Sequence, residues 1–456
     1  MSLRRIAAVF VIALTAASAA AQDAERADGT PTPRVSANAR VIDATPDDYL
    51  VRLRALRPGD TLRLAAGTYT GTPDTPGLPV YNLHGTADAP ITIEGPAKGA
   101  PAVFVGVRNH NTVRIANTSH VVLRDFHVDG RDLGGDGVNS QGISHHVTLE
   151  RLTIRGVGDD QGTVGISTNR APTWNWTIRR CTIVGAGTGM YLGNSDGRHP
   201  FVAGLIEHNL VRDTLGYNLQ VKHQLPWPDD VALPAEVTRT VIRHNVFSKS
   251  GNSSRGPMAR PNVLVGDVPV RGRGQGNGYE IYGNFFFQNP TEVLFQGEGN
   301  VAFYANLLVN DSGGGIAIQR HNGFVRDVRI FGNTVVASGT GIAIVAEATE
   351  HEQQVIANLV YADAPIVAVH QEANIVGSYR AARQELVRPH DATGGVDLRA
   401  RRGVASGPVL DMRETRSFID SDRDFDGRVR DWRVRGAYAI DEARSLRWRP
   451  RLAIKP

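Results

Sequence analysis

Lysine is rare in this chain. Of its 50 lysine and arginine residues, four are lysines, at positions 98, 222, 249 and 455. Lys222 lies in the segment 217–224, in which apolar and polar side chains alternate. A lysine whose pKa is lowered by nearby arginines can remove the proton next to a carboxylate. Those arginines would also neutralise the carboxylate and stabilise the charge that develops on it. The pattern therefore predicts β-elimination on an acidic substrate, and a solvated surface lysine is the alternative interpretation.

Two long polar segments near Lys222, 224–236 and 250–278, supply further candidates, because the second is rich in arginine. Insertions in repeat proteins collect on one face, which is often the binding face. The predicted catalytic set is Lys222 as base, Arg260 or Arg271 to neutralise the carboxylate, and His321 or Tyr279 to protonate the leaving oxygen.

The alternation around Lys222 predicts which side chains face solvent. If Leu219 and Val221 point inward, period two sends Asn218, Gln220 and Lys222 outward. The same alternation in 293–298 and 316–321 predicts a continuous exposed polar track, bordered by the two long segments. The residues that we expect to bind substrate are Asn218, Gln220, His223, Arg273, Gln296, Glu298, Gln319 and Arg320.

The elements that must position these side chains belong to a repeat that recurs nine times between residues 123 and 360. Each copy has an apolar residue, a fixed position three residues later, and a second apolar residue two after that. By subtraction, successive fixed positions are 22 to 39 residues apart, a spacing typical of solenoids. The fixed positions are Phe126, Leu152, Cys181, Asn209, Asn245, Asn284, Asn306, Asn333 and Asn358.

The repeats read as strands, because Val, Ile, Thr and aromatic residues alternate at period two and Gly, Asn and Asp fill the gaps. Stacked coils of short strands predict an all-β chain folded as a parallel β-helix, a solenoid. The six asparagines would form a column of amide-to-amide hydrogen bonds. A buried amide without partners costs about 1–3 kcal/mol, so a structural role is favoured. Cys181 is expected to be a buried small apolar residue.

The ends of the chain differ from the repeats. Residues 1–21 have Arg4 and Arg5, a short apolar core and three terminal alanines, which indicates a signal peptide, with a membrane anchor as the alternative. A flexible leader is expected over 22–40. The β-helix is expected over 41–376, with a capping helix opened by 45–48. Residues 377–456 are expected to pack on the last coils.

Charge and location point to an extracytoplasmic partner. The net charge of +4 and the pI near 9.3 weakly favour anionic partners, and no basic run with interleaved aromatics suggests nucleic acid. We expect a periplasmic or extracellular monomer with no membrane span after signal cleavage. An anionic polysaccharide is the expected partner.

Two parts of the chain resemble known families. The segment "PGDTLRLAAGTY" at 58–69 is similar to the N-terminal cap of secreted right-handed parallel β-helix proteins, including pectate lyase and chondroitinase B. The segments "EHNL" at 207–210 and "RHNVF" at 243–247 resemble rungs of polysaccharide lyase family six, the chondroitinase B and alginate lyase group. The resemblance implies a right-handed β-helix and a lyase acting on a uronate-containing polysaccharide, with Lys222 at the position of the catalytic lysine.

The chain departs from that family at two places. Asn218 and Gln220 stand where the family has two calcium-binding acidic residues, so calcium binding is not supported there. The family's catalytic arginine has no counterpart in 264–266, so Arg260, Arg271 or Arg273 would have to replace it from the loop.

Three alternatives stay open. A non-catalytic carbohydrate-binding or surface β-helix would use the same track for binding only. A glycoside hydrolase would pair Asp132 with Asp136 as acid and base. The segment 420–427 has the acidic spacing of a calcium loop but lacks its bidentate glutamate, so the cofactor is unknown and no metal ligand is assigned.

Overall fold

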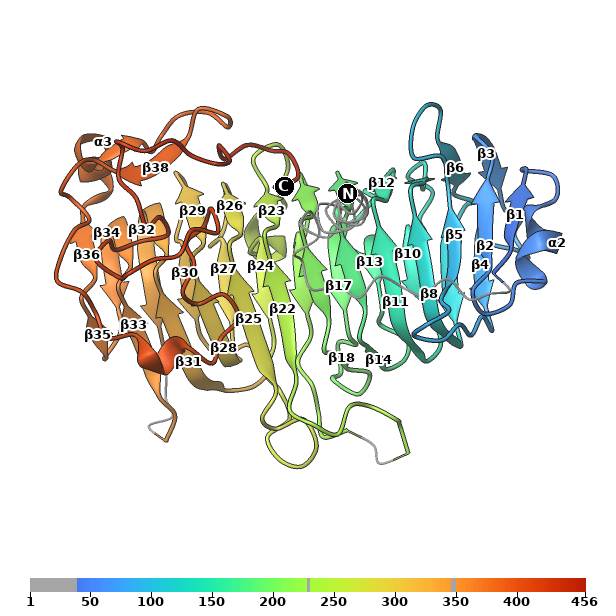
Figure 1. The fold of residues 1–456 in the computed structure, drawn as a ribbon, viewed down its shortest axis with the longest axis horizontal. Helices are drawn as coiled ribbons and strands as arrows, with labels where there is room; N and C mark the ends of the chain where they lie inside the picture. Colours follow the sequence, from blue (N-terminus) through green and yellow to red (C-terminus); the bar gives the residue numbers. More distant parts are fainter. Residues whose placement is uncertain (1–38, 228–229, 346–349) are drawn as a thin grey trace, which may run out of the picture.

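The computed structural model describes residues 39–227, 230–345 and 350–456. The signal peptide predicted for 1–21 and most of the leader predicted for 22–40 lie outside these residues. The described chain is a solenoid whose coils each place short strands on three faces, which we call A, B and C (Figure 1). Strands of successive coils pair in parallel along each face. The predicted all-β parallel β-helix is therefore confirmed.

Face A is one continuous sheet. Its strands are β1 (Val41–Ala44), β2 (Thr61–Leu64), β5 (Ile91–Glu94), β8 (Thr118–Arg124), β11 (Ser144–Glu150), β15 (Thr177–Arg179), β19 (Leu205–Glu207), β22 (Arg239–Arg243), β25 (Gly278–Tyr282), β28 (Gly299–Tyr304), β31 (Val325–Phe331), β33 (Gln353–Ile356) and β35 (Gln371–Glu372), with β14 (Thr173–Trp174) and β18 (Phe201–Val202) beside it.

Faces B and C share a second sheet. Face B contains β3 (Gly67–Thr70), β6 (Ala102–Val105), β9 (His127–Asp129), β12 (Thr153–Arg155), β16 (Thr182–Val184), β20 (Leu210–Arg212), β23 (Val246–Ser248), β26 (Phe285–Phe287), β29 (Leu307–Asn310) and β36 (Ile375–Gly377). Face C contains β4 (Leu78–Tyr81), β7 (Val113–Ala116), β10 (Val138–Ser140), β13 (Val164–Ser167), β17 (Thr188–Leu192), β21 (Leu219–Val221), β24 (Val263–Val265), β27 (Phe295–Gly297) and β30 (Ile316–Ile318). Two long strands, β32 (Thr334–Ile344) and β34 (Leu359–Val367), run through both faces.

The predicted asparagine column runs along the inside of one bend. The Nδ2 of each asparagine donates to the Oδ1 of the next at 2.9–3.1 Å, and the column continues beyond the predicted residues to Asn374. The six predicted asparagines are completely buried. Cys181 is buried next to the start of the column, where its backbone N donates to the Oδ1 of Asn209. Stacked amides thus satisfy one another, as the repeat predicted.

A short helix covers the N-terminal end of the solenoid. Helix α2 (Tyr49–Arg54) packs Tyr49 and Leu53 against the first coils, and the Tyr49 hydroxyl donates to the carbonyl oxygen of Gly77 at 2.6 Å. The predicted capping helix is therefore confirmed, although it begins after the predicted Thr45-Pro46 start. The turn at 45–48 is closed instead by the backbone N of Thr45, which donates to Asp48 Oδ1 at 2.8 Å.

The C-terminal segment runs back along the solenoid toward its middle (Figure 1). It contains η3 (Tyr379–Ala381), α3 (Ala382–Glu385), η4 (Arg413–Thr415) and an antiparallel pair, β37 (Leu386–Arg388) and β38 (Asp397–Ala400). Its Trp448 packs on Phe285, which points out from face B. Close to the end, Lys455 Nζ donates to the carbonyl oxygen of Gly283 at 2.9 Å. The apolar outer surface of face B is thereby covered from β20 to β36, and other apolar side chains of the segment pack on face A.

Candidate functional site

A polar cleft of about 570 Å³ lies on face C, between turns that leave both ends of its strands. Strands β13, β17, β21 and β27 form its floor. The residues that line it are Gln161, Gly162, Val164, Asn169, Thr188, Tyr191, Tyr217, Gln220, Lys222, Ala259, Arg260, Pro261, Glu292, Gln296 and His321.

Strand register places one side chain per coil on the cleft floor. Gln220 of β21 is aligned with Tyr191 of β17 on one side and with Leu264 of β24 on the other, and Leu264 is aligned with Gln296 of β27. The flanking residues Leu219 and Val221 are in the apolar core. The predicted alternation is therefore correct within β21.

The floor is nevertheless not an exposed track. Gln220 is 2% and Lys222 is 8% exposed, although both line the cleft. The turns on either side rise above the strands and exclude most solvent from these side chains. The prediction that these side chains are exposed is wrong, whereas the cleft that they line is bordered by part of the second long segment, as expected.

Lys222 follows directly after β21, at the edge of the cleft floor. Its Nζ lies 5.7 Å from the centre of the Tyr191 ring and makes no hydrogen bond to any described residue. Burial lowers the pKa of Lys222, and the negative charge of Glu298 acts against this shift. A Cβ at Gly266 would lie 2.3 Å from the backbone N of His223, so glycine is needed there to let the next coil approach. The lysine is thus partly desolvated in a position open to a ligand.

Arg260 reaches the cleft from the loop 249–262 that follows β23. Its Nη1 donates to the carbonyl oxygens of Pro257 and Ala259 at 2.9 and 2.7 Å, and no described group accepts from its Nη2. Beneath it, the fully buried Lys249 donates from Nζ to the carbonyl oxygen of Arg260 at 2.9 Å. Burial lowers the pKa of Lys249 to about 7. The loop is therefore held from below, with the guanidinium directed at the cleft.

His321 stands at the rim, on a turn that a buried carboxylate organises. Glu298 accepts from the backbone N of His321 at 2.7 Å and of Gly323 at 2.9 Å, and it is almost completely buried. Partial burial lowers the pKa of His321, while Glu298 opposes that effect. Glu298, predicted to bind substrate, therefore holds the turn that carries His321 and does not line the cleft.

Two tyrosines of the cleft were not predicted. Burial raises the pKa of both Tyr191 and Tyr217. Tyr191 could have been found from the sequence, because Met190 and Leu192 point inward and period two sends Tyr191 outward one coil before Gln220. Tyr217 lies before the first residue of β21, where no alternation applies. Both tyrosines line the cleft, so their hydroxyls are candidate proton donors.

Asn218 does not point into the cleft. It is completely buried, and its Nδ2 donates to Thr214 Oγ1 at 3.0 Å and to the carbonyl oxygen of Ser248 at 3.1 Å. The predicted outward position is wrong because β21 begins at Leu219, and period two does not hold in the turn before it. Asn218 closes the bend between faces B and C.

Two predicted arginines lie elsewhere. Arg271 is exposed on the loop that follows β24 and is absent from the residues lining the cleft. Arg273 donates to the carbonyl oxygens of Val231 and Leu233, and its guanidinium lies over the Trp227 ring. The described parts of the loops after β21 and β24 thus pack on each other, and they project from the lower edge of the solenoid (Figure 1). Among the described residues of the two predicted insertions, Ala259, Arg260 and Pro261 of the second line the cleft.

The remaining predicted residues lie around the edge or behind it. His223 is half-buried beside Lys222, with its ring against Gly197. Gln319 and Arg320 follow β30, and the Arg320 guanidinium lies over the Phe324 ring at 4.6 Å. His223, Gln319 and Arg320 do not line the cleft. Tyr279 is in the apolar core, so its predicted role as proton donor is wrong.

Carboxylates of the predicted hydrolase pair and of the predicted calcium loop accept hydrogen bonds from backbone N–H groups. Asp132 accepts from the backbone N of Gly158, and Asp136 from that of Val164. In the predicted calcium loop, Asp424 accepts from the backbone N of Asp426 and of Ala439. These are contacts of structural turns.

A calcium ion like that of family six does not fit this cleft. Ca²⁺ takes six to eight oxygen ligands, usually with several carboxylates. Glu292 supplies the one carboxylate among the described residues lining the cleft, where Gln220 and Gln296 supply amides. No step of the chemistry below depends on a metal.

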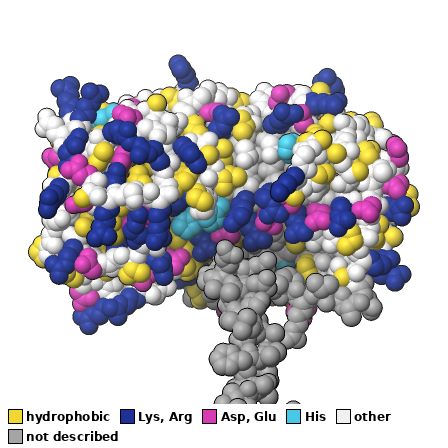
Figure 2. Space-filling model, turned by 45° about the horizontal axis from the view of Figure 1, so that its top comes forward, with side chains coloured by type: hydrophobic (Ala, Val, Ile, Leu, Met, Phe, Trp, Pro, Cys, Tyr) yellow, Lys and Arg dark blue, Asp and Glu magenta, His cyan; other side chains and the backbone are white. Residues whose placement is uncertain are grey.

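Charged side chains elsewhere are mixed rather than gathered. Figure 2 shows Lys and Arg spread over the face that it presents, interspersed with Asp and Glu. No helix in the described parts of the chain has the length and apolar composition needed to cross a bilayer.

Comparisons with known proteins agree on the fold. Residues 164–359 match the family model described as a right-handed β-helix region. No curated protein matches the chain in sequence. The solved GH136 lacto-N-biosidase from Eubacterium ramulus is 12% identical with a TM-score of 0.50, over 74% of this chain and 67% of that one.

Two lyases are more distant in structure. An alginate lyase from Paenibacillus sp. is 16% identical with a TM-score of 0.38, over 74% of this chain and 98% of that one. The pectate lyase Pel9A is 13% identical with a TM-score of 0.42, over 88% and 90%. The hand of the solenoid agrees with the prediction: the chain is a right-handed parallel β-helix, distantly similar to these proteins.

Proposed function

We propose that this right-handed β-helix protein cleaves an anionic, uronate-containing polysaccharide by β-elimination in the cleft of face C. The observation that carries the proposal is the convergence of Lys222, Arg260 and His321, from three separate coils, on one polar cleft. The signal peptide predicted for residues 1–21 would deliver the protein to the periplasm or the outside of the cell, where such polymers occur.

In this mechanism Lys222 acts as the base. Its Nζ removes the proton from the carbon next to the uronate carboxylate, and the electron pair forms a carbon–carbon double bond. The bond from the neighbouring carbon to the glycosidic oxygen then breaks. The lowered pKa of Lys222 favours the neutral amine that this step needs.

Arg260 is the group that stabilises the developing charge. Its Nη2 has no acceptor among the described residues, so it is available to the substrate carboxylate. A charge-assisted bond to that carboxylate grows stronger as electrons move onto it. Arg260 thus takes the role that the sequence left open among Arg260, Arg271 and Arg273.

The leaving oxygen needs a proton, and two groups can supply it. Tyr191 lies beside Lys222, and burial keeps its hydroxyl protonated at neutral pH. His321 stands at the rim on the turn held by Glu298. We assign the donor role to Tyr191 because its ring is next to the base, and His321 to substrate contact at the rim.

A glycoside hydrolase is the second candidate, since a lacto-N-biosidase has this fold. Both hydrolytic mechanisms use a pair of carboxyl groups on either side of the bond. Glu292 is the one carboxylate among the described lining residues, which also include one amine, one guanidinium and two phenols. The chemistry of the cleft therefore favours elimination.

The test is incubation of the mature protein with alginate, pectate, chondroitin and glucuronan. Elimination creates a double bond conjugated to the carboxylate, so ultraviolet absorbance and new reducing ends should rise together on one polymer. New reducing ends without that absorbance would assign a hydrolase. Binding of a polymer with neither signal would assign a non-catalytic binding protein.

A further inference from the structure

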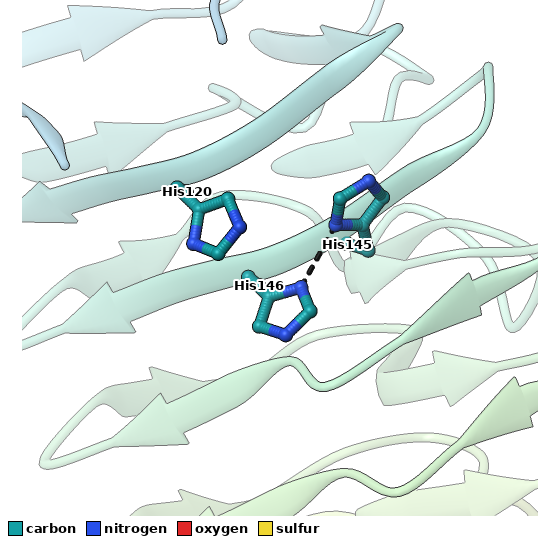
Figure 3. A group of neighbouring side chains, drawn as sticks. All are labelled: His120, His145 and His146. Atoms are coloured by element: carbon teal, nitrogen blue, oxygen red, sulfur yellow. Dashed lines mark hydrogen bonds between the residues drawn. The ribbon is translucent and has the colours of Figure 1, made fainter. Parts of the chain in front are cut away.

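A cluster of three histidines lies outside the cleft, on the outer surface of face A. His120 belongs to β8, and His145 and His146 to β11, its neighbour in the sheet (Figure 3). One ring nitrogen from each histidine lies within 4.8 Å of the other two. His146 is exposed and the other two are half-buried, so solvent reaches the group. Imidazole nitrogens at this separation are ligands for late transition metals.

The backbone brings the rings together in an unusual way. His120 and His146 both have left-handed backbone conformations, with φ of 52° and 54°. Their rings stack with centroids 4.4 Å apart, and His145 stacks on Trp174 at 4.6 Å. Non-glycine residues with positive φ are uncommon and merit a search for function. Here the bend turns two neighbouring side chains of β11 to the same side of the sheet.

Hydrogen bonds hold two of the three rings in place. The Nδ1 atoms of His145 and His146 are 2.8 Å apart, and the Nε2 of His146 is held by the Asn175 side-chain amide at 3.0 Å. A metal-bound histidine donates its other ring N–H to an oxygen, and the Asn175 side chain offers that acceptor once its amide is turned over so that Oδ1 faces Nε2. His120 makes no hydrogen bond to any described residue, so its nitrogens remain available.

We propose that His120, His145 and His146 bind one divalent late transition-metal ion, of the class of Zn²⁺ and Cu²⁺. With metal–nitrogen bonds of about 2.0–2.1 Å, two ligands at right angles lie about 2.9 Å apart and two tetrahedral ligands about 3.3 Å apart. The 2.8 Å pair needs only a few tenths of an ångström of adjustment for either geometry. Water would complete the coordination on the exposed side.

The protonation of the cluster suits a cation. Burial and the neighbouring histidines lower the pKa of His145 and His146, that of His146 to about 4, and burial lowers the pKa of His120. In its neutral form each ring offers a lone pair to a metal ion. The site shares no residue with the cleft, so its test does not depend on the lyase proposal.

The experiment is calorimetric titration of the mature protein, without a polyhistidine tag, with ZnCl₂ and with CuCl₂. We expect one equivalent to bind and the melting temperature to rise with metal concentration, since a ligand that binds only the folded state stabilises it. His145→Phe keeps the stacking on Trp174, and His120→Phe keeps that on His146. Each should abolish stoichiometric binding.

Two further variants separate ligand loss from damage to the fold. His127→Phe changes a half-buried histidine of face B and should bind as the wild type does. Asn175→Ala should weaken binding by about 10-fold, because it frees the far nitrogen of His146. Copper bound to the wild type should show nitrogen couplings in its electron paramagnetic resonance spectrum. The proposal is overturned if the wild type binds no equivalent of either metal, or if both phenylalanine variants bind as tightly as the wild type.

Discussion

The asparagine column and the floor of the cleft both bury polar side chains along the same solenoid, although Leu264 lies between Gln220 and Gln296 on the floor. In the column, each amide donates to one neighbour and accepts from the other. In the cleft, Gln220, Gln296 and Lys222 make no side-chain hydrogen bond to any described residue. The side chains of both rows are buried. Those of the column are hydrogen-bonded to one another, whereas those of the cleft make no side-chain hydrogen bond to any described residue.

This contrast distinguishes a polar row that stabilises the fold from a polar row that is available for binding. Buried polar groups in folded proteins are nearly always paired, so a paired row needs no further explanation. An unpaired row that faces a cleft is open to water and, in the proposed function, to the substrate. Substitutions in the two rows should therefore differ in whether they reduce activity or stability.

Removing the amine of Lys222 should abolish the chemistry and leave the fold intact. We expect Lys222→Met to lower kcat/KM by about 10²–10⁴-fold, the usual contribution of a general base. The free energy of unfolding should stay close to that of the wild type, because no described group depends on Nζ. Elimination rates and urea unfolding give the two readouts, with the exposed Lys98→Met as matched control. Full activity in Lys222→Met would remove this residue as base.

Breaking the asparagine column should instead lower the stability of the fold. Asn284→Ala removes bonds to the carbonyl oxygens of Ile242 and Tyr282 and to both neighbouring asparagines. Because these partners are buried, we expect the variant to lose about 3 kcal/mol of unfolding free energy. Asn374→Ala, at the half-buried end of the column, should cost less, since water replaces the lost group. Equal losses at both positions, measured by urea unfolding, would contradict this account.

Lys249 shares features of both rows. It is buried and hydrogen-bonded like the asparagines, and its partner is the backbone of Arg260 in the cleft. Its folded pKa of about 7 is below the unfolded value of about 10.4. Between these values the unfolded state binds the extra proton, so stability rises with pH, by at most about 1.4 kcal/mol per pH unit. Lys249→Met should remove this component from the slope of unfolding free energy against pH, and Lys98→Met should not. An unchanged slope in Lys249→Met would show that its amine is charged in the folded protein.

Gln220 should contribute to binding only. We expect Gln220→Ala to raise KM about 2- to 10-fold, the equivalent of one net hydrogen bond to substrate, with kcat and unfolding free energy little changed. Steady-state kinetics on the polymer that is cleaved would measure this. A loss of stability comparable to that of Asn284→Ala would place Gln220 with the structural row.

Much of the fold could be predicted because a solenoid repeats one local pattern. Apolar spacing predicted the coils, and the recurrence of asparagine predicted a column that needs only its nearest neighbours. Period two placed Gln220 and Gln296 correctly on the floor of the cleft. It failed at Asn218, which belongs to the bend before β21, because alternation exists only where the backbone is extended.

The paths of the long loops could not be predicted in the same way. Arg260 reaches the cleft while Arg273 packs on Trp227, although both lie in the same long segment. Which arginine reaches the cleft depends on contacts between residues far apart in the chain. The cluster of His120 with His145 and His146 has the same origin, since it needs both the register of β8 on β11 and the bends at positive φ.

The amino-acid sequence alone therefore determined the coil, the asparagine column and the inward or outward direction of side chains within strands. Each of these follows from interactions between residues one repeat apart. Tertiary packing determined the position of the polar row in a walled cleft, the loop residues that reach the cleft, and the meeting of the three histidines. Those features arise where turns of different length fold over the faces, and their packing is not encoded in any local period.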